Sequence, residues 1–146
     1  MSLKTLGLII GGLLPAVLLG FAGIFQKLAT NHPLGIGPFL MLTGLTTCLL
    51  GASYSLLDRD WGISRGGILM TIVFSLLWST STGLILVALR KFGASISQLA
   101  PLYNLNTLIA VLAGLIVLTE WRAVQPTRII AASVLIILGG VLAAKS

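Results

Sequence analysis

The stretch Gly66–Leu89, GGILMTIVFSLLWSTSTGLILVAL, contains 24 residues and no Asp, Glu, Lys or Arg. An α-helix rises 1.5 Å per residue, so crossing the hydrocarbon core of a bilayer, about 30 Å thick, takes roughly 20 apolar residues. Four other stretches also lack charged residues: Thr5–Gln26, Pro33–Leu57, Phe92–Thr119 and Ile129–Ala144. The sequence therefore predicts an all-α integral membrane protein with five transmembrane helices, built as one membrane domain over residues 1–146.

Composition supports a multi-pass membrane protein, and we expect it in the cell (inner) membrane. Hydrophobic residues make up 57% of the chain and charged residues 8%, whereas about a quarter of the residues in a soluble domain are charged. The net charge of +6 comes from basic residues that lie singly or in pairs at the ends of the apolar stretches. No basic stripe could follow a phosphate backbone, so nucleic acid is not an expected partner.

Residue types that commonly carry chemistry are scarce. Cys48 is the only cysteine, so an intrachain disulfide is excluded, and it suits a small buried apolar position. His32 is the only histidine, and no sequence cluster resembles a metal site or an activated nucleophile. We therefore expect no metal, no cofactor and no enzymatic activity.

The basic residues barely favour one orientation across the membrane. Alternating the five predicted spans puts five Lys and Arg residues on one side and four on the other, and this bias is what sets orientation. A chain with so small a bias can insert either way up. The two sides are Lys4, Arg59, Arg65, Arg122 and Arg128, and Lys27, Arg90, Lys91 and Lys145.

The third predicted span carries a polar face. Ser75, Trp78, Ser79 and Thr82 fall within about 100° of the helix circumference at 100° per residue. Ser and Thr hydroxyls often bond the carbonyl four residues earlier and serve as packing residues. Trp78, however, lies deep in its span rather than at the interface, where its ring could stack on a ligand. Both interpretations stay open.

The fourth span is polar on more than one side. Gln98, Pro101 and Asn104 share an arc of about 120° with Ser97, whereas Tyr103 points elsewhere. Pro101 lacks an N–H and crowds the preceding turn, which predicts exposed carbonyls near residue 97. Kinked helices often mark transporter sites, although asparagines in membranes also simply join helices.

These two faces define the predicted solute site. A tight turn at Arg90 and Lys91 makes the two spans antiparallel neighbours, so Trp78 and Asn104 should lie at similar depth and face one cavity. The candidate substrate-binding residues are Trp78, Ser79, Thr82, Gln98, Tyr103 and Asn104.

Spans 1 and 5 carry small residues typical of close helix packing. Span 1 has glycines and alanines on nearly one face leading to Lys27, which can snorkel to the headgroups or attract an anionic solute. Span 5 has Gly139 and Gly140, which suit a helix seam or a dimer contact.

The segment Phe92–Glu120, FGASISQLAPLYNLNTLIAVLAGLIVLTE, resembles the fourth span of EamA-like carriers in the drug/metabolite transporter superfamily. There an Ala-Ser pair opens the helix, a Pro follows about two turns in, and a Gly-Glu pair closes it. Ala94, Ser95, Pro101 and Glu120 occupy those places, but Thr119 stands where the family usually has Gly. The Gly-Val pair near the end of span 5 and the glycine-rich first span ending in Gln-Lys are also similar to that family.

This resemblance implies a single five-span repeat unit. Common EamA-like carriers contain two such units, inverted relative to each other, with substrate bound between them. A lone unit would rebuild that arrangement as an antiparallel homodimer. We therefore expect a membrane carrier for small organic solutes that works by alternating access. The alternative is a small non-transporting membrane subunit of a larger complex. No span holds an Asp or Glu, so proton antiport through a carboxylate is not expected.

Overall fold

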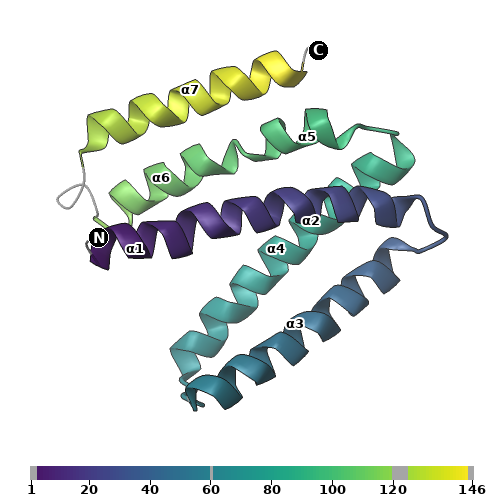
Figure 1. The fold of residues 1–146 in the computed structure, drawn as a ribbon, viewed down its shortest axis with the longest axis horizontal. Helices are drawn as coiled ribbons and strands as arrows, with labels where there is room; N and C mark the ends of the chain where they lie inside the picture. The colour runs from purple at the N-terminus through teal and green to yellow at the C-terminus, as the bar shows by residue number, and fades with distance from the viewer. Residues whose placement is uncertain (1–2, 60, 120–124, 145–146) are drawn as a thin grey trace. The chain divides into compact units, whose positions relative to one another are not determined.

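The fold was described from a computed structural model that covers residues 3–59, 61–119 and 125–144. All regular structure in these ranges is helical, as predicted. The chain forms two compact units, Met1–Gly93 and Ala94–Ser146, and each is described by itself. Figure 1 shows the helices of both units.

Unit 1 contains three long helical rods. The first consists of α1 (Leu3–Leu8), a π-helical segment η1 (Ile9–Leu13) and α2 (Leu14–Thr30). The others are α3 (Ile36–Asp58) and α4 (Arg65–Lys91). Both α2 and α3 pack against α4 (Figure 1). The buried hydrophobic residues described in this unit are Leu86 and Leu89, near the end of α4. The helices of unit 1 therefore pack most closely at the C-terminal end of α4.

Proline explains the π-helical segment in the first rod. Pro15 is the second residue of α2, which follows η1 without a gap. Proline lacks an amide hydrogen, and its ring collides with the carbonyl four residues earlier in a regular α-helix. A π-helical turn is wider and relieves that collision. The span therefore continues through Pro15 instead of ending there.

Short polar segments end the helices of unit 1. The turn after α2 begins at Asn31, whose amide donates to the carbonyl of Leu28 at 3.0 Å. Arg59 ends α3 in the left-handed conformation, with φ of 54°. The hydroxyl of Ser64 accepts the amide of Gly67 at 3.1 Å and caps the start of α4. Gly93, with φ of 65°, follows α4 at the predicted tight turn.

Unit 2 is a helical hairpin with an interrupted first arm. The first arm consists of α5 (Ile96–Tyr103) and α6 (Asn106–Ile116), and the second is α7 (Pro126–Ala144). Both α5 and α6 pack along α7 (Figure 1). Thr119, after α6, has φ of 55°. A β-branched residue rarely adopts this conformation and glycine adopts it readily, so Thr119 stands at a strained position.

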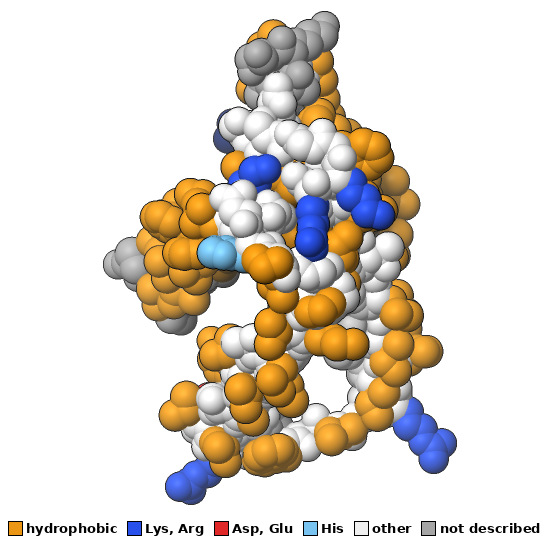
Figure 2. Space-filling view, turned by 90° about the vertical axis from the view of Figure 1, so that its right-hand side faces the viewer, with side chains coloured by type: hydrophobic (Ala, Val, Ile, Leu, Met, Phe, Trp, Pro, Cys, Tyr) orange, Lys and Arg blue, Asp and Glu red, His pale blue; other side chains and the backbone are white. Residues whose placement is uncertain are grey.

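The helices expose apolar rather than polar surface. Leu57 of α3 and Leu77 of α4 are 79% and 69% exposed, and hydrophobic side chains dominate the face drawn in Figure 2. Four helical segments are long and apolar enough to cross a membrane: Thr5–Thr30, Ile36–Asp58, Arg65–Lys91 and Ile96–Ile116. A shorter apolar helix covers Thr127–Leu142. Because water does not tolerate so much exposed apolar surface, these helices define a multi-pass helical membrane protein.

Candidate functional site

The three candidate residues of unit 1 lie together on α4. Trp78 is 45% exposed, and Ser79 and Thr82 are half-buried. They continue the line of side chains that leads to Leu86, which is 3% exposed. A Cβ atom added at the neighbouring Gly83 would meet a Leu40 methyl at 3.7 Å. The polar face of α4 therefore borders its packed seam with α3.

The hydroxyls of this face behave differently from those of α3. In α3 the hydroxyl of Thr43 donates to the carbonyl of Phe39 at 2.8 Å, and Thr47 repeats this bond to Thr43. Among the described residues, the hydroxyls of Ser79 and Thr82 make no such bond and both side chains are only half-buried. A hydroxyl without a partner in an apolar medium is costly, so these two groups are suited to meet a solute, a water molecule or another polar side chain.

Gln98 has a local structural role that the sequence reasoning missed. Ser95 is the N-cap of α5, and its hydroxyl oxygen accepts a hydrogen bond from the backbone N–H of Gln98 at 3.3 Å. The same hydroxyl donates to the Gln98 side-chain oxygen at 2.9 Å. The spacing S-x-x-Q is typical of a capping box, and this signal was present in the sequence. Gln98 therefore lies in the first turn of the helix, about 9 Å along the axis from Asn104 by the rise per residue.

Besides the donor that Pro101 cannot supply to the Ser97 carbonyl, the helix is interrupted at Asn104 and Leu105. The Leu105 amide donates to the Leu102 carbonyl at 3.1 Å, instead of to Pro101 as in a regular α-helix. Likewise, the Thr107 amide donates to Asn104 at 3.0 Å rather than to Tyr103. Asparagine favours caps and turns because its side chain competes for backbone hydrogen bonds. The Asn-Leu-Asn sequence is therefore the physical reason for the position of the break.

The carbonyl of Pro101 lies close to Gly140 of α7. A Cβ atom added at Gly140 would stand 2.8 Å from this oxygen, whereas one added at Gly139 would meet nothing within 4 Å. Gly140 is buried and Gly139 is exposed. The predicted close packing of span 5 thus exists within unit 2, through Gly140, and Gly139 stays on the open side of the helix.

Tyr103 and Asn104 stand at this break. Tyr103, the last residue of α5, is half-buried, and Asn104 is exposed. The polar candidates thus form one set on α4 and another at the end of α5, with Gln98 apart from the second set. Neither of two cavities in unit 1, one beside Arg90 and one beside Gly67, is lined by a candidate residue.

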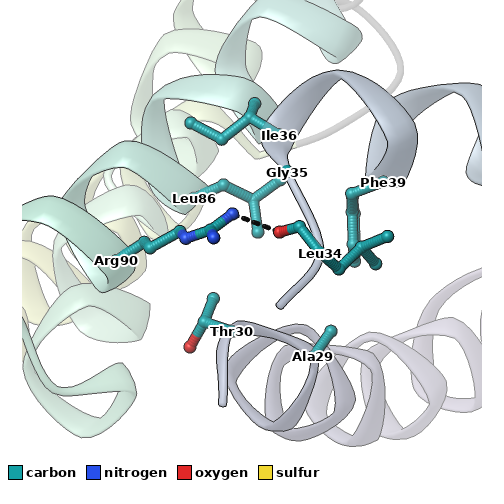
Figure 3. A pocket seen from close by; sticks show the side chains of 8 residues that line it. All are labelled: Ala29, Thr30, Leu34, Gly35, Ile36, Phe39, Leu86 and Arg90. Atoms are coloured by element: carbon teal, nitrogen blue, oxygen red, sulfur yellow. Dashed lines mark hydrogen bonds between the residues drawn. The ribbon is translucent and has the colours of Figure 1, made fainter. Parts of the chain in front are cut away.

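Two basic side chains hold the end of unit 1 together through backbone partners that could not be predicted from the sequence. The Lys27 ammonium lies 3.5 Å from the carbonyl of Leu89, and the Arg90 guanidinium donates to the carbonyl of Leu34. Lys27 thus serves as a tertiary contact rather than only a snorkelling cation. Figure 3 shows the Arg90 side chain extending to Leu34 across a small cavity of about 10 Å³, which is water-sized.

Predicted features at Glu120, Arg122 and Lys145 lie outside the described residues. Among the described residues, no three His, Cys, Asp or Glu side chains are grouped as a metal site. Comparisons with protein families, with curated proteins and with solved structures find no match for this chain. The resemblance to EamA-like carriers therefore rests on the sequence motifs quoted above.

Proposed function

We propose that this chain is a five-span membrane carrier for small organic solutes and that it works by alternating access as an antiparallel homodimer. The solutes are neutral polar or aromatic molecules, because the candidate residues offer hydroxyls, amides and aromatic rings. The proposal treats the chain as one EamA-like repeat unit and α7 as the fifth span.

The observation that carries the proposal is the break between α5 and α6. It lies inside an apolar segment, Ile96–Ile116, long enough to cross a bilayer. Around it the carbonyls of Pro101 and Tyr103 lose the donors they would have in a regular helix. Irregular backbone at membrane depth is stable only when it is buried in protein or lines a water-filled cavity. Discontinuous helices of this kind are typical of solute sites in carriers.

The polar face of α4 adds a second line of support. Trp78 offers an exposed aromatic surface next to the unbonded hydroxyls of Ser79 and Thr82. An aromatic ring that stacks on a ligand, with a few directional polar groups beside it, is the usual composition of a small-molecule site. We propose that Trp78, Ser79 and Thr82 contact solute in unit 1. In unit 2 the proposed solute-contacting residues are Tyr103 and Asn104.

The homodimer follows from the number of spans. With 19 residues, α7 is about 28 Å long, close to the thickness of the hydrocarbon core. Five spans place the two termini on opposite sides, so two copies inserted in opposite orientations would reproduce an inverted repeat. The five-to-four distribution of basic residues is compatible with insertion in both orientations.

A second candidate is a non-transporting subunit that packs within a larger membrane complex. It is favoured by the exposure of the helices. In each of the four long segments, at most 11% of the most apolar 18 residues are buried within the structure. The cavity beside Arg90 holds no more than a water molecule. A subunit whose partner covers its helices would have both properties.

Flux measurements separate the two candidates. Purified protein in liposomes should exchange at least one labelled solute from a panel of amino acids, sugars, nucleobases and aromatic compounds. Trp78→Ala and Asn104→Ala should abolish this flux, whereas Trp61→Ala, which removes a 64% exposed tryptophan outside the helices, should not. No flux from any solute, together with stable co-purification of another membrane protein, would favour the subunit.

A further inference from the structure

The end of unit 1 where α2 and α4 finish carries three cations. Lys27 lies in the last turn of α2, and Arg90 and Lys91 lie in the last turn of α4. The contact between Lys27 and the Leu89 carbonyl brings these two helix ends together. Arg90 and Lys91 are exposed and Lys27 is half-buried. We call Lys27, Arg90 and Lys91 the basic end of unit 1.

No acidic side chain lies near Arg90 and Lys91 in the part of unit 1 that the structure describes. The only acidic residue described in this unit is Asp58, at the far end of α3, about 33 Å from the start of that helix. The ends of α2 and α4 each contribute about half a negative charge through the helix dipole. The two exposed positive charges of Arg90 and Lys91 therefore exceed about one negative charge from the two dipoles.

The basic end is also shaped to meet a ligand at the surface rather than inside the protein. The bond to Leu34 uses one guanidinium donor of Arg90, and arginine has five, so its remaining donors are held in a fixed plane. The cavity behind this side chain is water-sized (Figure 3) and too small for a phosphate group. An anion must therefore approach Arg90 and Lys91 from outside.

The length of the helices sets the depth of this surface in a bilayer. The 23 residues of α3 extend about 34 Å, so both ends of the helix reach the headgroup region when its centre lies in the hydrocarbon core. Phe92, the residue after Lys91, is 80% exposed and provides an apolar surface for an acyl chain beside the cations. Clustered basic residues at this level attract anionic headgroups.

We propose that the basic end of unit 1 binds the headgroup of an anionic phospholipid, with Arg90 and Lys91 contacting its phosphate and Lys27 beside them. This site depends on membrane insertion and not on transport. It would give the chain a preference for anionic bilayers that the other end of the unit, with Arg59 and Arg65, does not supply.

Lipid retention measured by native mass spectrometry tests the proposal. The full chain in detergent is mixed with equal amounts of phosphatidylglycerol and phosphatidylcholine, and the lipids retained per protein are counted. Wild type should retain phosphatidylglycerol in preference. Arg90→Gln/Lys91→Gln should lower that preference by roughly fivefold for each cation removed. The matched control, Arg59→Gln/Arg65→Gln, removes two cations at the opposite end and should keep the preference.

Lys91→Gln alone distinguishes a loss of lipid binding from a loss of folding, because Arg90 also supports the turn at Leu34. It should lower the preference by roughly fivefold with an unchanged circular dichroism spectrum. The proposal is overturned if wild type shows no preference, if Lys91→Gln and the double variant retain it, or if the control pair loses as much as the Arg90 and Lys91 pair.

Discussion

Replacing Gly140 by alanine tests the packing of α7 against the helix break. The added Cβ atom would lie 2.8 Å from the Pro101 carbonyl oxygen and 3.4 Å from its carbon. A carbon and a carbonyl oxygen in favourable contact stay about 3.3–3.6 Å apart, so the helices must separate by about 0.5 Å. Because the opposing atom belongs to the backbone, no side-chain rotation relieves the contact.

The matched variant, Gly139→Ala, isolates this effect. Both positions lie in α7 and both variants gain about 1 kcal/mol from the higher helix propensity of alanine. Only position 140 suffers overpacking, which typically costs about 1–3 kcal/mol. Gly139→Ala should therefore be more stable than wild type, and Gly140→Ala should be less stable than Gly139→Ala by about 1–3 kcal/mol.

Equilibrium unfolding in mixed detergent micelles, followed by circular dichroism, measures the difference between these variants. Equal free energies of unfolding would refute the close approach between Gly140 and Pro101. So would a lower stability of Gly139→Ala than of Gly140→Ala, since a Cβ atom at position 139 meets nothing within 4 Å.

Three further predictions concern backbone and capping in unit 2. Thr119→Gly should raise the free energy of unfolding by about 0.5–1 kcal/mol, since φ of 55° strains a β-branched residue and not glycine; lower stability would contradict the left-handed conformation. Ser95→Ala should cost about 1 kcal/mol by removing the N-cap of α5, whereas Ser97→Ala should cost much less in the same unfolding assay. Pro101→Ala restores an amide donor for the Ser97 carbonyl, so it should raise the free energy of unfolding; unchanged or lower stability in the same assay would contradict the loss of that hydrogen bond in α5.

The helices were predictable because one property, the lack of charge over about 20 residues, decides them in a membrane. The apolar stretch Gly66–Leu89 became α4, with bounds extended to Arg65 and Lys91 because the flanking basic residues form its end turns. The capping pair Ser95 and Gln98 was also readable, since the S-x-x-Q spacing is local. Local signals of this kind need no knowledge of the partner helices.

The details of the candidate site were harder to predict because they depend on contacts between helices. Pro101 indicated a disturbed backbone near residue 97, where the Ser97 carbonyl lacks an amide donor. The interruption of the helix at Asn104 and Leu105 was not predicted. The carbonyl of Pro101 meets Gly140 on another helix, and Lys27 reaches the end of α4. Such pairings join residues distant in the chain, and periodicity within one helix carries no information about them.

The most direct test of the account is the location of the two termini in single insertion events. Leu3→Cys and Lys145→Cys are made separately in a Cys48→Ala background, which removes the native thiol, exposed in the structure rather than buried as predicted. Cells are labelled with a membrane-impermeant maleimide before and after permeabilisation. Five spans inserted in both orientations predict that each position is labelled from outside in about half of the molecules, and that position 3 crosslinks to position 145 when the two variants are co-expressed. Labelling of both positions from the same side only, or of position 3 always from one side, would contradict the antiparallel five-span carrier.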